Sequence, residues 1–437
     1  MKKIITLLTA VVLVGFVVPA FSAVENVKVG GDIVIKGIYR NNFDLTKKAG
    51  TNGDGESYLY TGARVYVSAE LSNNVSAMVR FINERDWGQT ARDIDLDLAY
   101  IKVADLLVPG LNLTVGRQEI QIADGLVVGS QYRNANPAAV GRYYDYGLQK
   151  AFDAIKLDYA FTAAPVSICA FKAKINELYN QPSDGDLYGL DIPIKLEKLI
   201  INPYYVRYEV GKQAPKGKQA PNVYPTLDTA GLKVAWSPLE ALSISGEYAK
   251  QFGDQTNNRD YEGWALVLGV DYKFATNMNP VVSVGYADFS GQKATATDQK
   301  AWVPVFPSNI ASRVGKIAYP ALFSNGEGNY NIKKRKKRII GTGSGVRALK
   351  LGLGLQPTEK VGVSLDLFNL TADETFGGVD DSVGNEIDLT ISYAYSEDLT
   401  FGLELGYLMA GDYIEDTVGK RNDENAWQAI ATMKVAF

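Results

Sequence analysis

The chain has 437 residues, with 45 Lys and Arg against 49 Asp and Glu, and a formal net charge of −4. It has no His and one Cys, which excludes Ser-His-Asp catalysis, His-ligated metal sites and an intrachain disulfide. A net negative charge argues against a globally basic nucleic-acid binder. We therefore expect no enzyme activity, no cofactor, no metal site and no nucleic-acid partner.

Residues 1–23 have the pattern of an export signal. Lys2 and Lys3 precede an apolar run over 4–18, and the small-residue segment 19–23 follows it. Cleavage after Ser22 or after Ala23 fits this pattern. A retained N-terminal anchor helix is the alternative, but the run is shorter than the roughly 20 residues that a membrane-spanning helix needs. The expected domains are a signal peptide over 1–23 and one β-barrel over 24–437.

The rest of the chain repeats stretches of alternating apolar and polar residues. In 63–71, Ala63, Val65, Val67, Ala69 and Leu71 share one face, and the residues between them are mostly polar. This period of two predicts strands with one apolar face. Eighteen such stretches begin near Val27, Tyr58, Val75, Ile94, Leu111, Phe152, Val166, Leu187, Leu199, Leu227, Leu242, Glu262, Pro280, Val346, Val361, Glu386, Leu399 and Ala426.

The connections between these stretches alternate in length. Each even-numbered stretch ends in a short turn, such as 72–74 or 109–110. Odd-numbered stretches end in longer polar segments, such as 122–150 and 290–345. Short periplasmic turns and long extracellular loops are typical of bacterial outer-membrane barrels. We therefore predict an all-β fold: a transmembrane antiparallel β-barrel of about 18 strands in the bacterial cell outer membrane.

Aromatic residues near the ends of the apolar faces support this fold, because amphipathic rings gather at membrane interfaces. A soluble β-sandwich with core aromatics is the alternative. The final stretch ends on Phe437, and a terminal aromatic on the apolar face resembles the assembly signal of outer-membrane barrels. We expect outer-membrane lipid, lipopolysaccharide and, through Phe437, the barrel-assembly machinery as partners. The sequence leaves the oligomeric state open.

One region is similar to a known family. The segment 95–103 contains Ala99-Tyr100-Ile101, segment 111–119 ends Gly116-Arg117-Gln118-Glu119, and a Gly-rich stretch follows at 124–129. Segment 152–157 resembles the next strand of the same pattern, with Ala154 where Gly is common. Over about 65 residues the chain thus resembles the alginate-export porin family. The resemblance implies an 18-stranded barrel and an anionic polysaccharide among the possible solutes.

Charged residues on the polar faces are the candidate pore lining, because such side chains tune what passes through a wide barrel. The alternative is that they are solvated wall charges paired across strands. Basic residues of the first half form a possible positive ladder for an anionic solute. The candidates for pore lining and selectivity are Arg64, Arg80, Arg117, Glu119, Lys156, Asp158, Arg207 and Lys233.

The predicted direction of the Arg117 side chain depends on a change in the alternation of apolar and polar residues. Leu111, Leu113 and Val115 are apolar at odd positions, whereas Ile120 and Ile122 are apolar at even ones. A β-bulge at Gly116 would turn Arg117 into the lumen. The alternative is that the strand ends at Gly116 and Arg117 caps a loop.

A basic run lies in the longest predicted loop and consists of Lys333, Lys334, Arg335, Lys336, Lys337 and Arg338. It is a solvated loop tip, a site for lipopolysaccharide phosphates, or a basic segment at the channel mouth. The sequence does not choose among the three.

The sequence predicts an outer-membrane porin, a channel for passive passage of small solutes or of an anionic oligosaccharide or polysaccharide. The alternative is a surface-exposed structural or adhesin-type barrel without transport. Barrel phospholipases and proteases use His, which this chain lacks. A plugged receptor needs a folded domain before the first strand, and here that strand begins within about ten residues of the expected cleavage.

Overall fold

The computed structural model describes residues 25–42, 55–88, 93–129, 151–175, 185–209, 225–256, 259–293, 296–308, 310–318, 344–375, 379–418 and 425–437. The predicted signal peptide and the basic run 333–338 lie outside these ranges. No helix among the described residues is long and apolar enough to cross a membrane.

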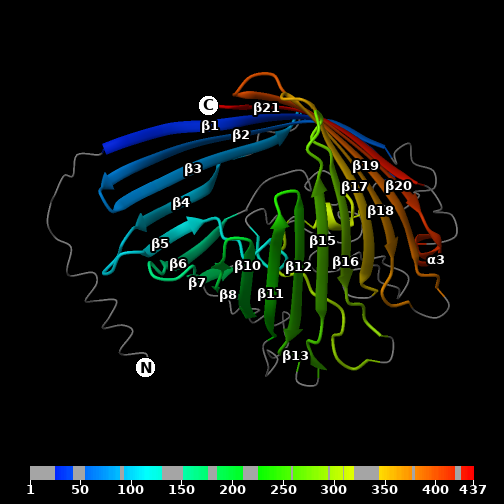
Figure 1. The fold of residues 1–437 in the computed structure, drawn as a ribbon, viewed down its shortest axis with the longest axis horizontal. Helices are drawn as coiled ribbons and strands as arrows, with labels where there is room; N and C mark the ends of the chain where they lie inside the picture. The colour runs from blue at the N-terminus through cyan, green and yellow to red at the C-terminus, as the bar shows by residue number, and fades with distance from the viewer. Residues whose placement is uncertain are drawn as a thin grey trace.

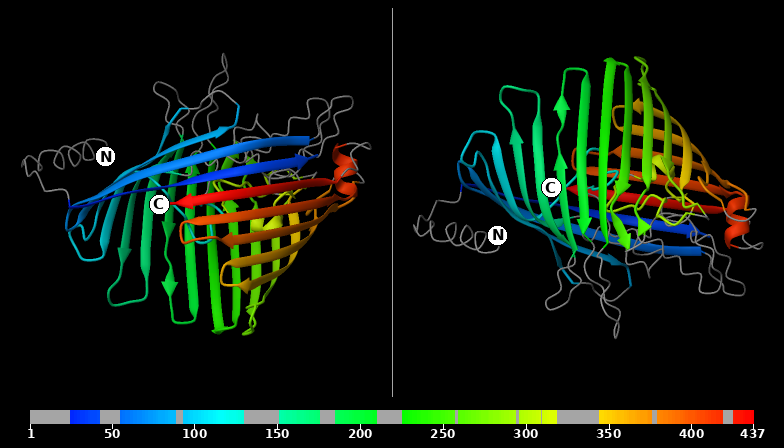
Figure 2. Two further views of the ribbon diagram at one scale, coloured as in Figure 1. Left: turned by 90° about the horizontal axis from the view of Figure 1, so that it is seen from above. Right: turned by 90° about the horizontal axis from the view of Figure 1, so that it is seen from below.

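The wall of the protein is one antiparallel sheet (Figures 1 and 2). Its first half contains β1 (Glu25–Asn41), β2 (Gly55–Ser72), β3 (Val75–Asp86), β4 (Asp95–Val103), β5 (Leu111–Gln118), β6 (Phe152–Ala160), β7 (Ser167–Ile175), β8 (Gly185–Asp191), β9 (Ile194–Lys195) and β10 (Leu199–Glu209). Its second half contains β11 (Thr226–Leu239), β12 (Leu242–Phe252), β15 (Trp264–Lys273), β16 (Val281–Phe289), β17 (Val346–Thr358), β18 (Val361–Thr371), β19 (Ser382–Ala394), β20 (Leu399–Ala410) and β21 (Ala426–Ala436).

These nineteen strands make an eighteen-stranded barrel. The short β9 pairs with the same strand, β10, as β8 does, so β8 and β9 are two parts of one wall strand. The barrel closes where β1 pairs with β21, drawn blue and red side by side in Figure 1. The predicted strand count and antiparallel barrel are confirmed. A separate hairpin of β13 (Asp254–Thr256) and β14 (Arg259–Asp260) and two short helices, α2 (Ala311–Val314) and α3 (Asp412–Val418), are not strands of the wall.

The last residue takes part in the closure. The Phe437 N–H donates to the Gly31 carbonyl at 3.0 Å, and the Gly31 N–H donates to the Phe437 carbonyl at 2.8 Å. The pairing therefore continues past β21 to the end of the chain, which leaves fewer unpaired backbone groups at the seam.

The two faces of the wall follow the predicted alternation. Large apolar side chains point outward and stay exposed, among them Val29 (67% exposed), Ile155 (55%) and Leu349 (55%). Aromatic rings pair on this outer face near strand ends, as in Tyr39 against Trp427, with ring centroids 4.8 Å apart. An apolar outer belt with aromatic ends is the surface that a lipid bilayer stabilises.

The register of β5 corrects one prediction. Gly116 pairs opposite Tyr100 on β4 and Ala154 on β6 with no shift on either side, so it carries no bulge. The glycine is needed for another reason. Its φ is +121°, and a Cβ there would lie 2.2 Å from the Ala99 carbonyl oxygen. The irregularity lies in β4 instead, where Asp97 is an extra residue between the partners of Arg80 and Phe81.

Candidate channel constriction

The chain that follows β5 turns inward rather than outward. Ile120, Ile122, Leu126, Val127 and Val128 are all at most 3% exposed, and they join one buried cluster with inward-facing wall residues. An apolar stretch of this kind is stabilised by leaving water, which explains why it folds against the inner face of the wall. We call residues 119–129 the first inner segment.

A second inner segment, residues 296–318, comes from the long connection between β16 and β17. Trp302, Phe306, Ile310, Val314 and Ile317 are each at most 5% exposed and belong to the same cluster. In the views from above and below, the yellow part of the chain that contains them lies within the curved wall (Figure 2). Sequence reasoning left open whether this connection enters the lumen, and its described part does so.

The two inner segments bind one another through backbone hydrogen bonds. The Phe306 N–H donates to the Val127 carbonyl and the Gly129 N–H donates to the Phe306 carbonyl, both at 2.9 Å. The Ser308 N–H donates to the Gly125 carbonyl at 2.7 Å. A Cβ at Gly129 would lie 1.9 Å from the Ser308 Oγ, so this close approach requires glycine.

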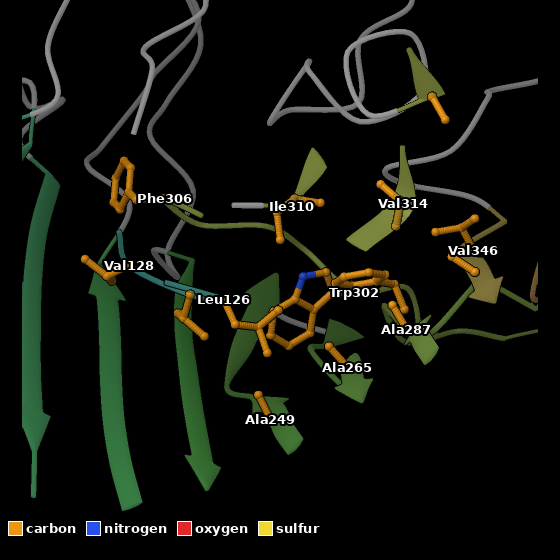
Figure 3. Packing of buried hydrophobic residues seen from close by; sticks show 14 of the residues in the cluster. Leu126, Val128, Ala249, Ala265, Ala287, Trp302, Phe306, Ile310, Val314 and Val346 are labelled. Atoms are coloured by element: carbon orange, nitrogen blue, oxygen red, sulfur yellow. The ribbon is translucent and has the colours of Figure 1, made fainter. Parts of the chain in front are cut away.

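Small wall residues make room for the second inner segment. Ala249, Ala265 and Ala287, on β12, β15 and β16, are at most 1% exposed, and Figure 3 shows them around Trp302. Phe306 packs edge-on against Phe152 on β6 and Tyr208 on β10, with ring centroids 5.5 and 5.4 Å away. Alanines at inward positions thus mark where a loop, rather than water, covers the wall.

Polar contacts anchor the second inner segment at two places. Near its start, Gln251 on β12 donates to the Val303 carbonyl at 2.7 Å and accepts from the Val303 N–H at 2.9 Å. Near its end, the two carboxylate oxygens of Glu386 on β19 accept from the Ile317 and Ala318 N–H groups at 2.6 and 2.8 Å. Because Gln251 and Glu386 are both fully buried, these hydrogen bonds also satisfy polar groups that burial would otherwise leave costly.

Lys316, the residue before Ile317, also contacts the wall. The Lys316 N–H donates to Asp388 at 3.0 Å, and its ammonium contacts Glu404 at 2.8 Å and Thr390 at 2.5 Å. Sequence reasoning placed Glu386 in a strand but missed its role. Inward-facing acids on a strand do not show which distant loop will meet them.

The large buried cluster does not extend to one sector of the wall. The large buried cluster takes residues from β6, from most strands between β7 and β21, and from both inner segments, but none from β1 to β4. The inward side chains of β1 to β4 include the charged and aromatic residues Lys36, Tyr60, Arg64, Tyr66 and Arg80. A smaller apolar cluster of Ile38, Tyr60 and Ile430 lies among them. Among the described residues, the large apolar cluster therefore fills one side of the barrel interior, and most of the inward-facing charges lie on the other side.

Six of the predicted pore-lining residues lie on the inner side, and each forms an ion pair. Arg64 pairs with Asp32 on β1, and Lys233 on β11 pairs with Asp124 of the first inner segment. Arg80 contacts Asp97 at 2.5 Å and Glu119 at 2.7 Å. Lys156 and Asp158, two residues apart on β6, pair at 3.1 Å. The structure thus shows paired charges, across strands, along one strand and with the first inner segment, instead of an uncompensated positive ladder.

Arg117 and Arg207 do not face the lumen, contrary to the prediction. Arg117 lies opposite Asp153 and contacts it at 3.1 Å. Asp153 shares its face of β6 with the outward-facing Ile155. Arg207 alternates with the buried, inward-facing Val206 and pairs with Asp228 at 2.7 Å. The regular register at Gly116 and the inward placement of Tyr208 fix both arginines on the outer face.

The comparisons with known proteins agree with this architecture. The model of a family described as alginate export matches residues 26–428. The chain belongs to the alginate export family. No curated protein matches the sequence.

Solved structures from Pseudomonas aeruginosa share the fold of this alginate export family member. OccK9 (OpdG) of Pseudomonas aeruginosa has a TM-score of 0.57 at 10% identity, covering 94% of this chain and 99% of that chain. OccD3 (OpdP) of the same organism has a TM-score of 0.57 at 10% identity, covering 95% and 94%. OccK11 (OpdR), also of P. aeruginosa, has a TM-score of 0.53 at 13% identity, covering 94% and 96%. The protein is a porin of the bacterial outer membrane.

Proposed function

We propose that this porin passively conducts small polar solutes, with anionic carbohydrate oligomers among them, along the inner face of β1 to β4. The observation that carries the proposal is the combination of side chains on that face. Arg64 and Arg80 face inward on β2 and β3, and the partly buried Tyr66 lies opposite Arg80. The family name, alginate export, points to a solute of the same class.

The chemistry of this face suits an acidic sugar. The C–H surface of a sugar ring packs on an aromatic face, and guanidinium groups bind carboxylates with charge-assisted hydrogen bonds. The ion pairs of Arg64 and Arg80 keep each cation in place and reduce its net attraction. Weak, repeated contacts of this kind support conduction, because a solute must bind well enough to enter and poorly enough to leave.

We further propose that passage involves no catalysis. The support is chemical: the chain has no His, and the polar groups of the proposed path form ion pairs and hydrogen bonds with one another. An adhesin-type barrel without transport is the alternative that the experiment below separates from a channel.

The test is single-channel conductance of the full chain in planar bilayers, with and without short uronic-acid oligomers. We expect stable open steps, and partial block by the charged oligomers at concentrations where neutral oligomers of the same length have little effect. Arg64→Gln with Arg80→Gln should weaken the block, whereas Arg347→Gln, a paired arginine on the outer face, should leave it unchanged. Absence of open steps would favour the adhesin-type barrel, and equal block by neutral oligomers would refute the preference for anionic sugars.

A further inference from the structure

Two buried acids meet the end of the second inner segment. Glu386 and Asp388 lie two residues apart on the inner face of β19 and are 0% and 2% exposed. Their carboxyl groups are within hydrogen-bonding reach of one another. Together they accept hydrogen bonds from three successive backbone N–H groups, those of Lys316, Ile317 and Ala318. We call Glu386 and Asp388 the acid pair.

One oxygen atom of the acid pair has no donor. The Oδ2 atom of Asp388 accepts from the Lys316 N–H at 3.0 Å, whereas its buried Oδ1 atom accepts no hydrogen bond from the part of the chain that the structure describes. An ionised carboxylate has no proton to donate, so Glu386 can satisfy this oxygen only when it is protonated. A buried acceptor without a donor is costly. The geometry therefore leaves a place for one proton between the two carboxyl groups.

The charges around the acid pair do not compensate it. Lys316 also contacts Glu404 on β20, at 2.8 Å. Asp366 on β18 lies opposite Asp388, and it pairs with Lys350 on β17 at 3.1 Å. Arg313 of the second inner segment is 3.8 Å from Glu247 on β12. Helix α3, which packs on β19 and β20, carries the titratable residues Asp412, Tyr413, Glu415 and Asp416. The elements that pack against the acid pair thus supply more acids than cations.

We propose that the acid pair makes the attachment of the second inner segment depend on pH, and that acidification holds the segment on the wall. With the segment attached, Glu386 carries a proton and donates it in a hydrogen bond to the Oδ1 atom of Asp388. When the segment leaves the wall, water solvates both carboxyl groups, and they ionise as exposed carboxyl groups do, at about pH 4.

The sign of the effect follows from linkage. Attachment takes up a proton that release gives back, so a lower pH favours the attached segment and a higher pH favours its release. The proposal concerns the position of residues 296–318 and does not depend on which solute passes. Only its consequence for conductance rests on the proposed channel function.

The first test is hydrogen–deuterium exchange of the full chain in lipid nanodiscs, measured over residues 310–318 by mass spectrometry and corrected for the intrinsic pH dependence of exchange. We expect protection in the wild type to fall by about tenfold between about pH 5 and about pH 8, which is the effect of one unit of difference in proton affinity between the attached and the released states. Glu386→Gln with Asp388→Asn replaces the shared proton by amide groups, so its protection should be the same at both pH values.

The matched control removes two buried acids elsewhere on the wall. Asp191 on β8 accepts from Asn202, and Glu84 on β3 accepts from Tyr60. Asp191→Asn with Glu84→Gln should therefore keep the pH response of the wild type. Heat-modifiable migration of each variant on gels, with the barrel folded or boiled, checks that a loss of protection is not a loss of folding.

Single-channel recording gives the second measurement. Wild-type channels should change between conductance levels less often at the lower pH, and the rate of these changes should not depend on pH in the Glu386→Gln, Asp388→Asn variant. Absence of open steps at every pH would refute the proposed channel, and the exchange measurement would then still decide whether the acid pair holds the segment.

Three results would overturn the proposal. They are protection in the wild type that is constant or rises with pH, a pH response that persists in the Glu386→Gln, Asp388→Asn variant, and loss of the response in the Asp191→Asn, Glu84→Gln control. The third result would place the proton-sensitive group in another part of the wall.

Discussion

The inner-face charges of this porin act as pairs. Asp97 is almost fully buried beneath Arg80, and Glu119 of the first inner segment reaches the same guanidinium from the other side. A solute at this point meets the balance of three groups within a few ångströms, because charges farther away than a Debye length, about 8 Å at physiological salt, are largely screened. The formal charge of the whole chain therefore has little bearing on ion selectivity.

Two substitutions at this triad should move selectivity in opposite directions. Arg80→Gln removes the cation and leaves Asp97 and Glu119, so we expect a shift towards cations. Glu119→Gln leaves Arg80 with one carboxylate, so we expect a shift towards anions. The measurement is the reversal potential across a KCl gradient, with Arg347→Gln as the control on the outer face. Shifts of the same sign in both variants would show that neither residue contacts the ion path.

At the level of elements, the second inner segment determines how much of the barrel interior stays open. It is attached by apolar packing around Trp302, by hydrogen bonds with Gln251, and by backbone N–H groups that donate to Glu386. The packing supplies most of the free energy because it removes a large apolar area from water. The hydrogen bonds determine where the segment lies, because they join specific backbone groups to specific strands.

Trp302→Ala should loosen the second inner segment. Truncating a buried Trp typically costs about 3–5 kcal/mol, and here the loss falls on the contact between the segment and the wall alanines. We expect a larger and noisier single-channel conductance, with the barrel itself still folded. Trp302→Phe keeps most of the apolar contact, so its conductance should lie between those of the wild type and Trp302→Ala. A conductance equal to that of the wild type in Trp302→Ala would mean that the segment does not narrow the path.

Glu386→Ala should release the other end of the same segment. It removes the acceptor of two backbone N–H groups, each hydrogen bond to a charged group being worth about 1.5–3 kcal/mol. We expect more frequent transitions between conductance levels and faster protease cleavage near residue 317. Glu386→Gln retains one amide oxygen as an acceptor and should show a smaller effect. If both variants behave like the wild type, Glu386 is not the anchor.

At the level of the whole molecule, the closed barrel depends on a seam between the two ends of the chain. The pairing of β1 with β21 runs from Asp32 opposite Ala436 to Asn41 opposite Trp427 without a shift. A closed barrel has no unpaired strand edges, which is why a membrane tolerates it. β1 and β21 can pair in this way only when every strand between them pairs with its neighbours in the correct register.

Disulfide crosslinking should report this register. In a Cys169→Ala background, Ile35→Cys with Met433→Cys places two thiols at directly opposed positions, where the Cβ atoms are close enough to bridge. We expect the oxidised protein to form this crosslink efficiently after assembly in outer membranes. The offset pair, Ile35→Cys with Val435→Cys, should crosslink poorly. Comparable crosslinking of the two pairs would indicate a different seam.

The sequence alone determined the architecture of this porin. Strand positions follow from period-two alternation, which is a property of neighbouring residues, and short turns after even strands revealed the outer-membrane barrel. The inward direction of Arg64, Arg80, Lys156 and Lys233 followed from the same alternation.

Only the tertiary structure decided that Arg117 and Arg207 face outward, because the face of a side chain depends on the register of several strands. The change in alternation after Gly116 predicted a bulge there, whereas the bulge lies at Asp97. Only the tertiary structure placed residues 296–318 inside the barrel. The contacts of Trp302 and Glu386 join segments tens of residues apart, and no local pattern encodes which distant wall position an apolar loop will meet.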